Sequence, residues 1–319
     1  MVIINRVKLM IRLKYVRFLA VVFCFVAITG CAVKPDHATL AGSVYVEQPL
    51  FIDNGTYKIP AILVKPAQAT GKPFPVVVML HGTASQKNEV GGLYQRLAVD
   101  LAEVGIASVR IDFAGTGDSP VDYRFYNLTS AQRDVASTLD YLTTQQDIDA
   151  QRIGLIGFSQ GGLIAQLVAT KDARIKSLVA WSSVSGNGTG VFLSFFDDYY
   201  AEAKANGFAV VKFPWRPEPL NFGLQWFEEV KANSSLQDLK NYHGKLLAIA
   251  GTADTLVPYE SSINIINHAG TTNAELHLIK GADHMFNVLG SANANGLAED
   301  QSTAETVLSI TTYWIDKNL

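Results

Sequence analysis

A serine stands between two glycines in the stretch IGLIGFSQGG, residues 153–162, directly behind an apolar run. The apolar run predicts a strand and the residues after Ser159 predict a helix, which would place the serine on a sharp turn. Such a turn strains the serine backbone and crowds the positions two residues away, where Gly157 and Gly161 have no side chain. Ser159 is therefore a candidate nucleophile on an elbow formed with these glycines. The alternative is an incidental glycine-rich turn, since the short pattern is common.

A serine nucleophile needs a base, and the base needs an acid that orients it. Asp254 follows one strand-like apolar run, and His284 follows the last such run. Because the carboxyl ends of parallel strands meet at one edge of a sheet, both side chains can reach Ser159 there. We therefore expect a triad of Ser159, Asp254 and His284. Asp283 is the weaker candidate acid, because sequence neighbours rarely point at one another across an imidazole.

Two backbone N–H groups are candidates for an oxyanion hole, which holds the negative charge of a tetrahedral intermediate. His81 and Gly82 end a strand-like run and lead into Thr83. We expect the N–H groups of Thr83 and of Gln160, the residue after the serine, to be the two donors. A plain turn is the alternative interpretation of the His-Gly pair.

Several other functions find no support in the sequence. The formal charge is −3 and the first thirty residues hold five basic and no acidic side chains, so the remainder is more acidic still and is not suited to nucleic acid. Gly115 and Gly117 lack the third glycine of a dinucleotide-binding loop, and we expect them to shape a turn. No spacing typical of a metal site is present, so we expect neither a metal nor a cofactor.

The N-terminus predicts a targeting segment. Its basic residues precede an uncharged run, 18–28, which as a helix reaches about 16 Å and is too short for a hydrocarbon core of about 30 Å. Residues 28–31 resemble the bacterial lipobox, so we expect a lipoprotein signal peptide at 1–30, a lipidated Cys31 and a tether at 31–42. An ordinary signal peptide is the alternative, and translation could also start at Met10. The resemblance implies attachment to a membrane of the bacterial cell envelope, facing the periplasm or at the outer membrane.

The sequence of residues 43–319 predicts one α/β domain. Short β-rich runs in 44–66 predict an antiparallel sheet edge with a turn at Asn54-Gly55. Strand-like runs and helical stretches then alternate, which predicts a mostly parallel sheet, buried on both faces, with helices on both sides. The expected strands are 75–80, 107–112, 152–157, 177–182, 245–251 and 274–280, and the expected helices are 93–104, 130–144, 161–170, 259–268 and 304–317.

One long segment interrupts this alternation and predicts an inserted cap subdomain at about 186–240. About sixty residues separate two expected strands there, more than a crossover requires. Aromatic residues are concentrated in it, and they either line a pocket for an aromatic acid or form the cap's own core. They are Phe192, Phe195, Phe196, Tyr199, Tyr200, Phe208, Phe213, Trp215, Phe222, Trp226 and Phe227.

The segments HGTASQKNE, GIASVRIDFAGTGDS and GFSQGG resemble the α/β-hydrolase superfamily, within it the bacterial cinnamoyl or feruloyl esterases and the related acylaminoacyl-peptidase-like and dienelactone-hydrolase-like proteins. Dienelactone hydrolases use a cysteine nucleophile, whereas this chain has Ser159. The resemblance implies the α/β-hydrolase fold and a serine esterase for small or aromatic, hydroxycinnamoyl-type esters, with a small-molecule ester as its partner. A peptidase or acyltransferase with the same triad, and a non-catalytic binding module on this fold, are the alternatives.

Overall fold

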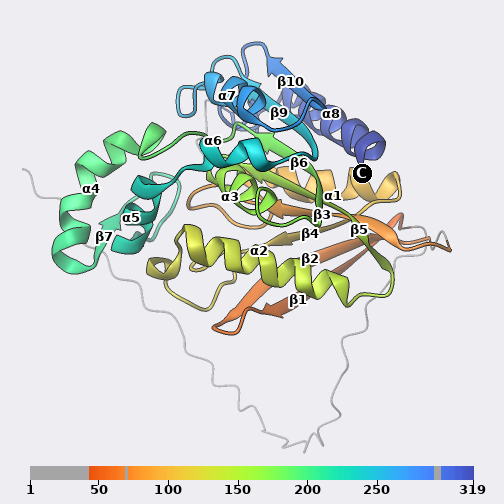
Figure 1. Ribbon diagram of the computed structural model, residues 1–319, viewed down its shortest axis with the longest axis horizontal. Coiled ribbons are helices and arrows are strands. Elements are labelled where there is room, and N and C mark those ends of the chain that lie inside the picture. Colours follow the sequence, from red (N-terminus) through yellow and green to blue (C-terminus); the bar gives the residue numbers. More distant parts are fainter. Residues whose placement is uncertain (1–42, 69–70, 291–295) are drawn as a thin grey trace, which may run out of the picture. The chain divides into compact units, whose positions relative to one another are not determined.

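Residues 43–68, 71–290 and 296–319 are described by the computed structural model of the protein (Figure 1). The signal peptide, the tether and Cys31 expected from the sequence lie outside these ranges, so they stay predictions. Within the described ranges, every helix is too short or too polar to cross a lipid bilayer.

An eight-stranded sheet forms the centre, in the order β1-β2-β4-β3-β5-β6-β9-β10. β1 and β2 form an antiparallel hairpin at one edge, β2 also pairs antiparallel with β4, and the other pairs are parallel. This arrangement confirms the mostly parallel sheet with an antiparallel edge. The strands are β1 (Tyr45–Asp53), β2 (Lys58–Pro66), β3 (Phe74–Leu80), β4 (Ala107–Ile111), β5 (Ile148–Phe158), β6 (Ile175–Trp181), β9 (Lys245–Gly251) and β10 (Ala274–Ile279).

Helices cover both faces of the sheet, as the alternation predicts. α2 (Leu128–Thr143), α3 (Gln160–Ala169) and α7 (Glu260–His268) pack in the buried cluster of one face. α1 (Leu93–Glu103) and α8 (Ser302–Asn318) pack in the cluster of the other. Short 3-10 helices lie at Val90–Gly92, Tyr123–Phe125, Gly190–Phe192 and Leu239–Asn241.

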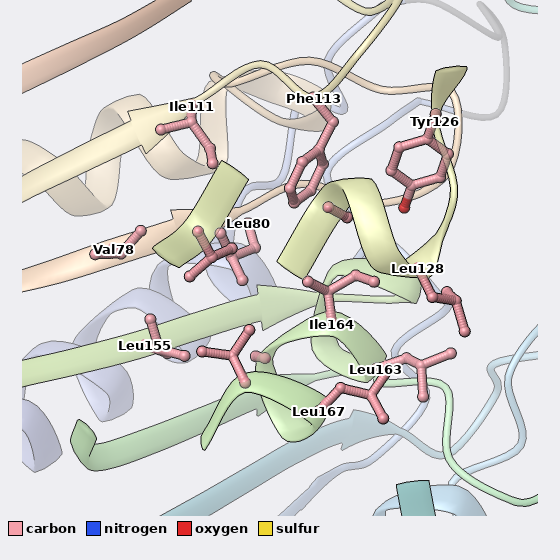
Figure 2. Close-up of a cluster of buried hydrophobic side chains, with 14 of the residues drawn as sticks. Val78, Leu80, Ile111, Phe113, Tyr126, Leu128, Leu155, Leu163, Ile164 and Leu167 are labelled. Carbon is pink, nitrogen blue, oxygen red and sulfur yellow. The ribbon is translucent and has the colours of Figure 1, made fainter. Parts of the chain in front are cut away.

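The core beneath α3 fixes the start of that helix against the central strands. Figure 2 shows Val78 of β3 and Leu155 of β5 in one buried cluster with Leu163, Ile164 and Leu167 of α3. Burial of a leucine or isoleucine side chain stabilises a fold by about 1.5–3 kcal/mol. The helix that follows the candidate nucleophile is therefore held rigidly against the sheet.

The expectation of burial on both faces is wrong for β10. Its residues are intermediate or exposed, and Leu276 and Leu278 are 36% and 39% exposed. Among the described residues, β10 pairs with β9 alone and is the last strand of the sheet, so no described strand covers its outer side. An apolar run in the sequence does not distinguish such an edge strand from a central one.

The segment between β6 and β9 contains α4 (Leu193–Asn206), β7 (Phe208–Val211), β8 (Leu220–Gly223), α5 (Leu224–Ala232) and α6 (Ser235–Asp238). β7 and β8 form a separate antiparallel hairpin. In Figure 1, α4, β7 and α5 lie together beside the central sheet. We call residues 186–240 the cap segment. Its bounds as a subdomain of its own stay a prediction.

Candidate active site

Ser159 has a strained backbone at the junction of β5 and α3, with φ 54° and ψ −119°. Residues other than glycine rarely adopt such angles, which persist where the surrounding structure enforces them. The described residues hold six non-glycine positions with a positive φ, and all follow the carboxyl ends of sheet strands: Ala84, Glu89, Ser159, Ser182, Phe286 and Asn287. Strain is thus concentrated at the edge where a parallel sheet binds ligands.

Gly157 and Gly161 allow the close approach that the turn at Ser159 requires. A Cβ on Gly157 would lie 2.2 Å from the carbonyl oxygen of Gly161, and a Cβ on Gly161 would lie 2.1 Å from that of Leu80. Both contacts are with backbone atoms, which cannot move aside cheaply. A side chain at either position would displace the elbow.

His284 and Asp254 are joined by a hydrogen bond of 2.7 Å between Nδ1 and Oδ2. The other carboxylate oxygen of Asp254 accepts the backbone N–H groups of Leu256 and Val257 at 2.9 and 2.8 Å. The Asp254 side chain is fully buried, so these donors fix its orientation. A carboxylate only accepts, so Nδ1 carries a proton and Nε2 of the neutral ring is the free basic nitrogen.

The weaker candidate acid, Asp283, is engaged elsewhere. It is exposed, and its Oδ1 accepts the backbone N–H groups of Met285 and Asn287. His243 and His268 each bond a backbone carbonyl oxygen, outside the cavity described next. The geometry therefore favours the pairing of Asp254 with His284.

Ser159 and His284 line one cavity of about 570 Å³. Thr83 also lines this cavity, and the ring of His284 packs on that of Phe158 with centroids 4.9 Å apart. A hydrogen bond from Ser159 Oγ to the imidazole is not among the contacts of the described residues. Such bonds are often long in unliganded enzymes and tighten when substrate binds.

The two expected oxyanion donors belong to residues that contact each other. The hydroxyl of Thr83 donates to Oε1 of Gln160 at 2.8 Å, which joins the loop after β3 to the elbow. Among the contacts of the described residues, the backbone N–H groups of Thr83 and Gln160 have no acceptor. Thr83 lines the cavity, so its N–H is available to a negatively charged oxygen there. Gln160 is fully buried and is not among the lining residues, so its N–H stays a predicted donor.

His81 orients the peptide that carries the Thr83 N–H. Its Nε2 accepts the N–H of Phe113 at 3.2 Å, so Nδ1 is the protonated nitrogen and donates to the carbonyl oxygen of Gly82 at 2.8 Å. Burial lowers the pKa of His81, which keeps the ring neutral. The C=O and N–H groups of a planar trans peptide point in opposite directions, so holding the Gly82 oxygen aims the Thr83 N–H.

Glu89 is a structural residue of this loop that the sequence analysis missed. It is buried, and its carboxylate accepts the N–H of Gly82, the hydroxyl of Ser85 and the N–H of Val90 at 2.6–2.9 Å. Nothing in the local sequence distinguishes it from a solvated glutamate. Its role follows only from the fold of residues 81–92.

Gly117, one of the two glycines of RIDFAGTGDS, lies against an ion cluster formed by the buried Lys87 and Asp112 and the exposed Asp118. Lys87 Nζ lies 2.6 Å from the carboxylates of both Asp112 and Asp118. Burial alone would lower the pKa of Lys87, but these hydrogen bonds outweigh it and raise the pKa. A Cβ on Gly117 would lie 2.2 Å from Asp112. These glycines shape a turn, as the sequence predicts.

The cap aromatics divide between the two interpretations. Six line the cavity, namely Phe192, Phe195, Phe213, Trp215, Phe222 and Trp226. The other five do not line it: Phe196, Tyr199, Tyr200, Phe208 and Phe227. Some serve both purposes, since Trp226 and Phe222 are buried in the core and also bound the cavity.

Across the described parts of the chain, no group of three or more His, Cys, Asp or Glu side chains could hold a metal ion.

A known family and several known proteins match part of the chain in sequence. Residues 71–206 match the model of a family described as serine aminopeptidase, S33. YtaP of Bacillus subtilis (strain 168) is 33% identical over 155 residues, which are 42% of this chain and 52% of YtaP. YcjY of Escherichia coli (strain K12) is 28% identical over 135 residues, 42% of this chain and 43% of YcjY. The chain thus spans about half the length of the curated relatives that it matches.

Solved structures match most of the chain. Est1E from Butyrivibrio proteoclasticus, with ferulic acid bound, is 20% identical with a TM-score of 0.64 and covers 84% of this chain and 98% of its own. DcsB in complex with its substrate analogue is 18% identical with a TM-score of 0.65, over 86% and 99%. The esterase domain of a Rhodothermus marinus protein is 18% identical with a TM-score of 0.60, over 85% and 98%. At these identities the likeness concerns the fold.

Proposed function

We propose that this chain, an α/β-hydrolase by fold as its sequence predicts, is a serine carboxylic ester hydrolase that works through an acyl-enzyme. One observation carries the proposal: His284, held by a buried Asp254, lines the same cavity as the strained Ser159. A base with a fixed tautomer beside a serine on an elbow is the arrangement that activates an alcohol.

In the proposed reaction, Ser159 Oγ attacks the ester carbonyl carbon while His284 Nε2 takes the hydroxyl proton. Asp254 holds the Nδ1 proton and stabilises the imidazolium. The carbonyl oxygen becomes an oxyanion that accepts the N–H groups of Thr83 and Gln160. When this intermediate collapses, the C–O bond to the alcohol breaks and the imidazolium returns its proton to the leaving alcohol. A water molecule, activated by the same histidine, then cleaves the acyl-enzyme and releases the acid.

The cavity walls support the proposed substrate class. Aromatic side chains of the cap segment form much of the lining, and such walls suit small or aromatic acyl groups. Est1E, a structural neighbour, is described with ferulic acid bound. Hydroxycinnamoyl-type esters are therefore the aromatic substrates that we propose to test first.

A second candidate function is that of an aminopeptidase, because residues 71–206 match the serine aminopeptidase model. An amino-terminal ammonium group requires a free acceptor, usually a carboxylate. Glu89, which lines the cavity, already accepts three hydrogen bonds. Turnover of 4-nitrophenyl butanoate compared with that of alanine 4-nitroanilide separates the two functions. We expect the ester to be turned over and the anilide to be left intact.

A fluorophosphonate probe tests the proposed nucleophile directly. We expect the probe to label the protein and to leave Ser159→Ala unlabelled, and we expect 4-nitrophenyl acetate turnover to fall about 10³-fold or more in that variant. Equal turnover by Ser159→Ala would exclude the mechanism. Equal unfolding curves of the two proteins serve as the control for folding.

We also propose that Cys31 is lipidated and attaches the enzyme to a membrane of the bacterial cell envelope. The basic segment, the short apolar run and the lipobox-like residues 28–31 support this proposal. Cys31→Ala should move the protein from the membrane fraction to the soluble fraction. A variant that remains in the membrane fraction would contradict lipid attachment.

A further inference from the structure

Arg216 lies in the loop between β7 and β8 and lines the cavity of the candidate active site. The backbone N–H of Arg216 donates to the carbonyl oxygen of Phe213 at 3.1 Å, and this bond closes a turn. Pro214, Pro217 and Pro219 flank the arginine, and proline fixes its own φ and restricts the residue before it. The loop therefore presents the guanidinium from a backbone with little conformational freedom.

Arg216 is half-buried, and most hydrogen-bond donors of its guanidinium have no acceptor among the described residues. Nη1 donates to the carbonyl oxygen of Ala84 at 3.1 Å, and Nε is buried with no hydrogen-bond partner. A guanidinium has five N–H donors, and the Ala84 carbonyl is the one acceptor that the described residues give it. A buried donor without an acceptor destabilises a protein, so such a group calls for an explanation.

The acidic side chains that line or border the cavity do not neutralise Arg216. The oxygens of Glu89 accept from Gly82, Ser85 and Val90, and those of Asp254 accept from His284 and two backbone N–H groups. Among the described residues Arg216 makes no ion pair. The cavity therefore contains a positive charge that is left for a ligand.

This charge lies close to the proposed site of reaction. Ala84, which accepts from Arg216, directly follows Thr83, the proposed oxyanion donor. Consecutive Cα atoms are about 3.8 Å apart, so a short acyl chain with its carbonyl at Thr83 can reach the guanidinium. Phe213 and Trp215, whose ring centroids are 4.8 Å apart, flank the arginine in the lining.

We propose that Arg216 binds a free carboxylate on the acyl part of the substrate, so that the preferred substrates are monoesters of dicarboxylic acids. The proposal rests on the proposed esterase function and narrows its substrate class. The planar fork of a guanidinium matches the two oxygens of a carboxylate, and such a charge-assisted pair is stronger than a hydrogen bond between neutral groups. The same charge repels the ammonium group of a peptide.

Two esters of equal chain length test the proposal. 4-Nitrophenyl hydrogen adipate carries a terminal carboxylate, whereas 4-nitrophenyl hexanoate lacks it and has the same leaving group. We expect kcat/KM for the adipate to exceed that for the hexanoate, and Arg216→Gln to lower this ratio about 10- to 100-fold. The ratio cancels any general loss of activity that follows from losing the bond to Ala84. A protein that does not favour the adipate, or a ratio unaltered by Arg216→Gln, overturns the proposal.

Lys212→Gln is the matched control. Lys212 is exposed, lies four residues before Arg216 and does not line the cavity. Removing it changes the net charge as Arg216→Gln does, so the ratio should stay within about two-fold of its value in the unaltered protein. An equal fall in both variants would show a long-range charge effect and would contradict a specific site. A preference for a phosphonate-terminated hexanoyl ester over the adipate would contradict carboxylate as the anion.

A binding measurement separates this inference from the esterase proposal. Trp215 and Trp226 line the cavity, so tryptophan fluorescence can follow ligand binding in Ser159→Ala. We expect 4-phenylbutanoate to bind at least ten-fold more tightly than its neutral amide, and Arg216→Gln in the same background to abolish the difference. If neither ester is turned over but this difference is present, the carboxylate site stands and the esterase proposal fails. If the hexanoate ester is turned over but 4-phenylbutanoate binds no more tightly than its amide, the esterase proposal stands and the carboxylate site fails.

Discussion

Thr83 and Gln160 lie 77 positions apart in the chain, and a hydrogen bond of 2.8 Å from the Thr83 hydroxyl to Gln160 Oε1 joins them. Gln160 is fully buried, and its Nε2 has no partner among the described residues, so the Thr83 hydroxyl is the contact that fixes its amide. Thr83 is therefore both a proposed oxyanion donor, through its backbone, and a positioning residue for the second donor, through its side chain.

Thr83→Val separates these two roles because it keeps the N–H and the shape of the side chain but removes the hydroxyl. We expect kcat to fall about ten-fold with KM little changed, less than the 10²- to 10³-fold loss that follows removal of an oxyanion donor. Thr83→Ser retains the hydroxyl and should keep most of the activity. Steady-state kinetics on a 4-nitrophenyl ester measure both effects, and a fall in Thr83→Ser equal to that in Thr83→Val would contradict the role of the hydrogen bond.

Asp254→Asn should lower kcat about 10⁴-fold, because an amide at this position no longer selects the Nδ1-protonated tautomer of His284. Asp283→Asn is the matched control, since Asp283 adjoins His284 in sequence but bonds the backbone of residues 285 and 287. We expect that variant to stay within a few-fold of the parent rate. A larger loss in Asp283→Asn than in Asp254→Asn would reverse the assignment of the acid.

Gly157→Ala should destabilise the protein by about 3 kcal/mol or more and abolish activity, because the new methyl group meets the Gly161 carbonyl oxygen at 2.2 Å. Gly154→Ala in the same strand is the control. Its methyl group would find its nearest atom, in the side chain of Leu319, at 3.4 Å, which is ordinary contact. Urea unfolding measures both variants, and equal loss of stability in the two would contradict the steric explanation.

The sequence predicts the central architecture well because buried parallel strands are short continuous apolar runs and helices repeat at 3.6 residues. β3 to β6 and α1 to α3 lie where the periodicity places them. The elbow could be predicted equally well, since Ser159 and its two glycines lie within five consecutive residues. In both cases the residue pattern of a single segment carries the information, although the contacts that require it are partly long-range.

Features that depend on distant contacts could not be predicted. The exposure of β10 depends on its being the last strand, and the role of Glu89 depends on where the Gly82 N–H points. In the cap segment, aromatic residues occur without a clear period, so the sequence does not separate lining residues from core residues. The proposed role of Arg216 could not be predicted from its sequence neighbours either, because it depends on the cavity that Arg216 lines.

A buried carboxylate remote from the cavity predicts how stability depends on pH. Asp134 on α2 accepts hydrogen bonds from Tyr57 and Asn54, yet burial outweighs them and raises its pKa from 3.8 to about 6. The folded state therefore binds a proton more tightly than the unfolded state between about pH 4 and pH 6. This group favours folding as pH falls through that range, and its contribution is lost as pH rises through 6.

The difference in unfolding free energy between the protein and Asp134→Asn isolates this effect, because other carboxylates titrate alike in both. Lowering the pH from 7 to 4.5 should raise the stability of the protein relative to the variant, by at most about 3 kcal/mol, since each pKa unit corresponds to about 1.4 kcal/mol. Urea unfolding at several pH values gives the two curves, and parallel curves would show that Asp134 stays ionised in the fold.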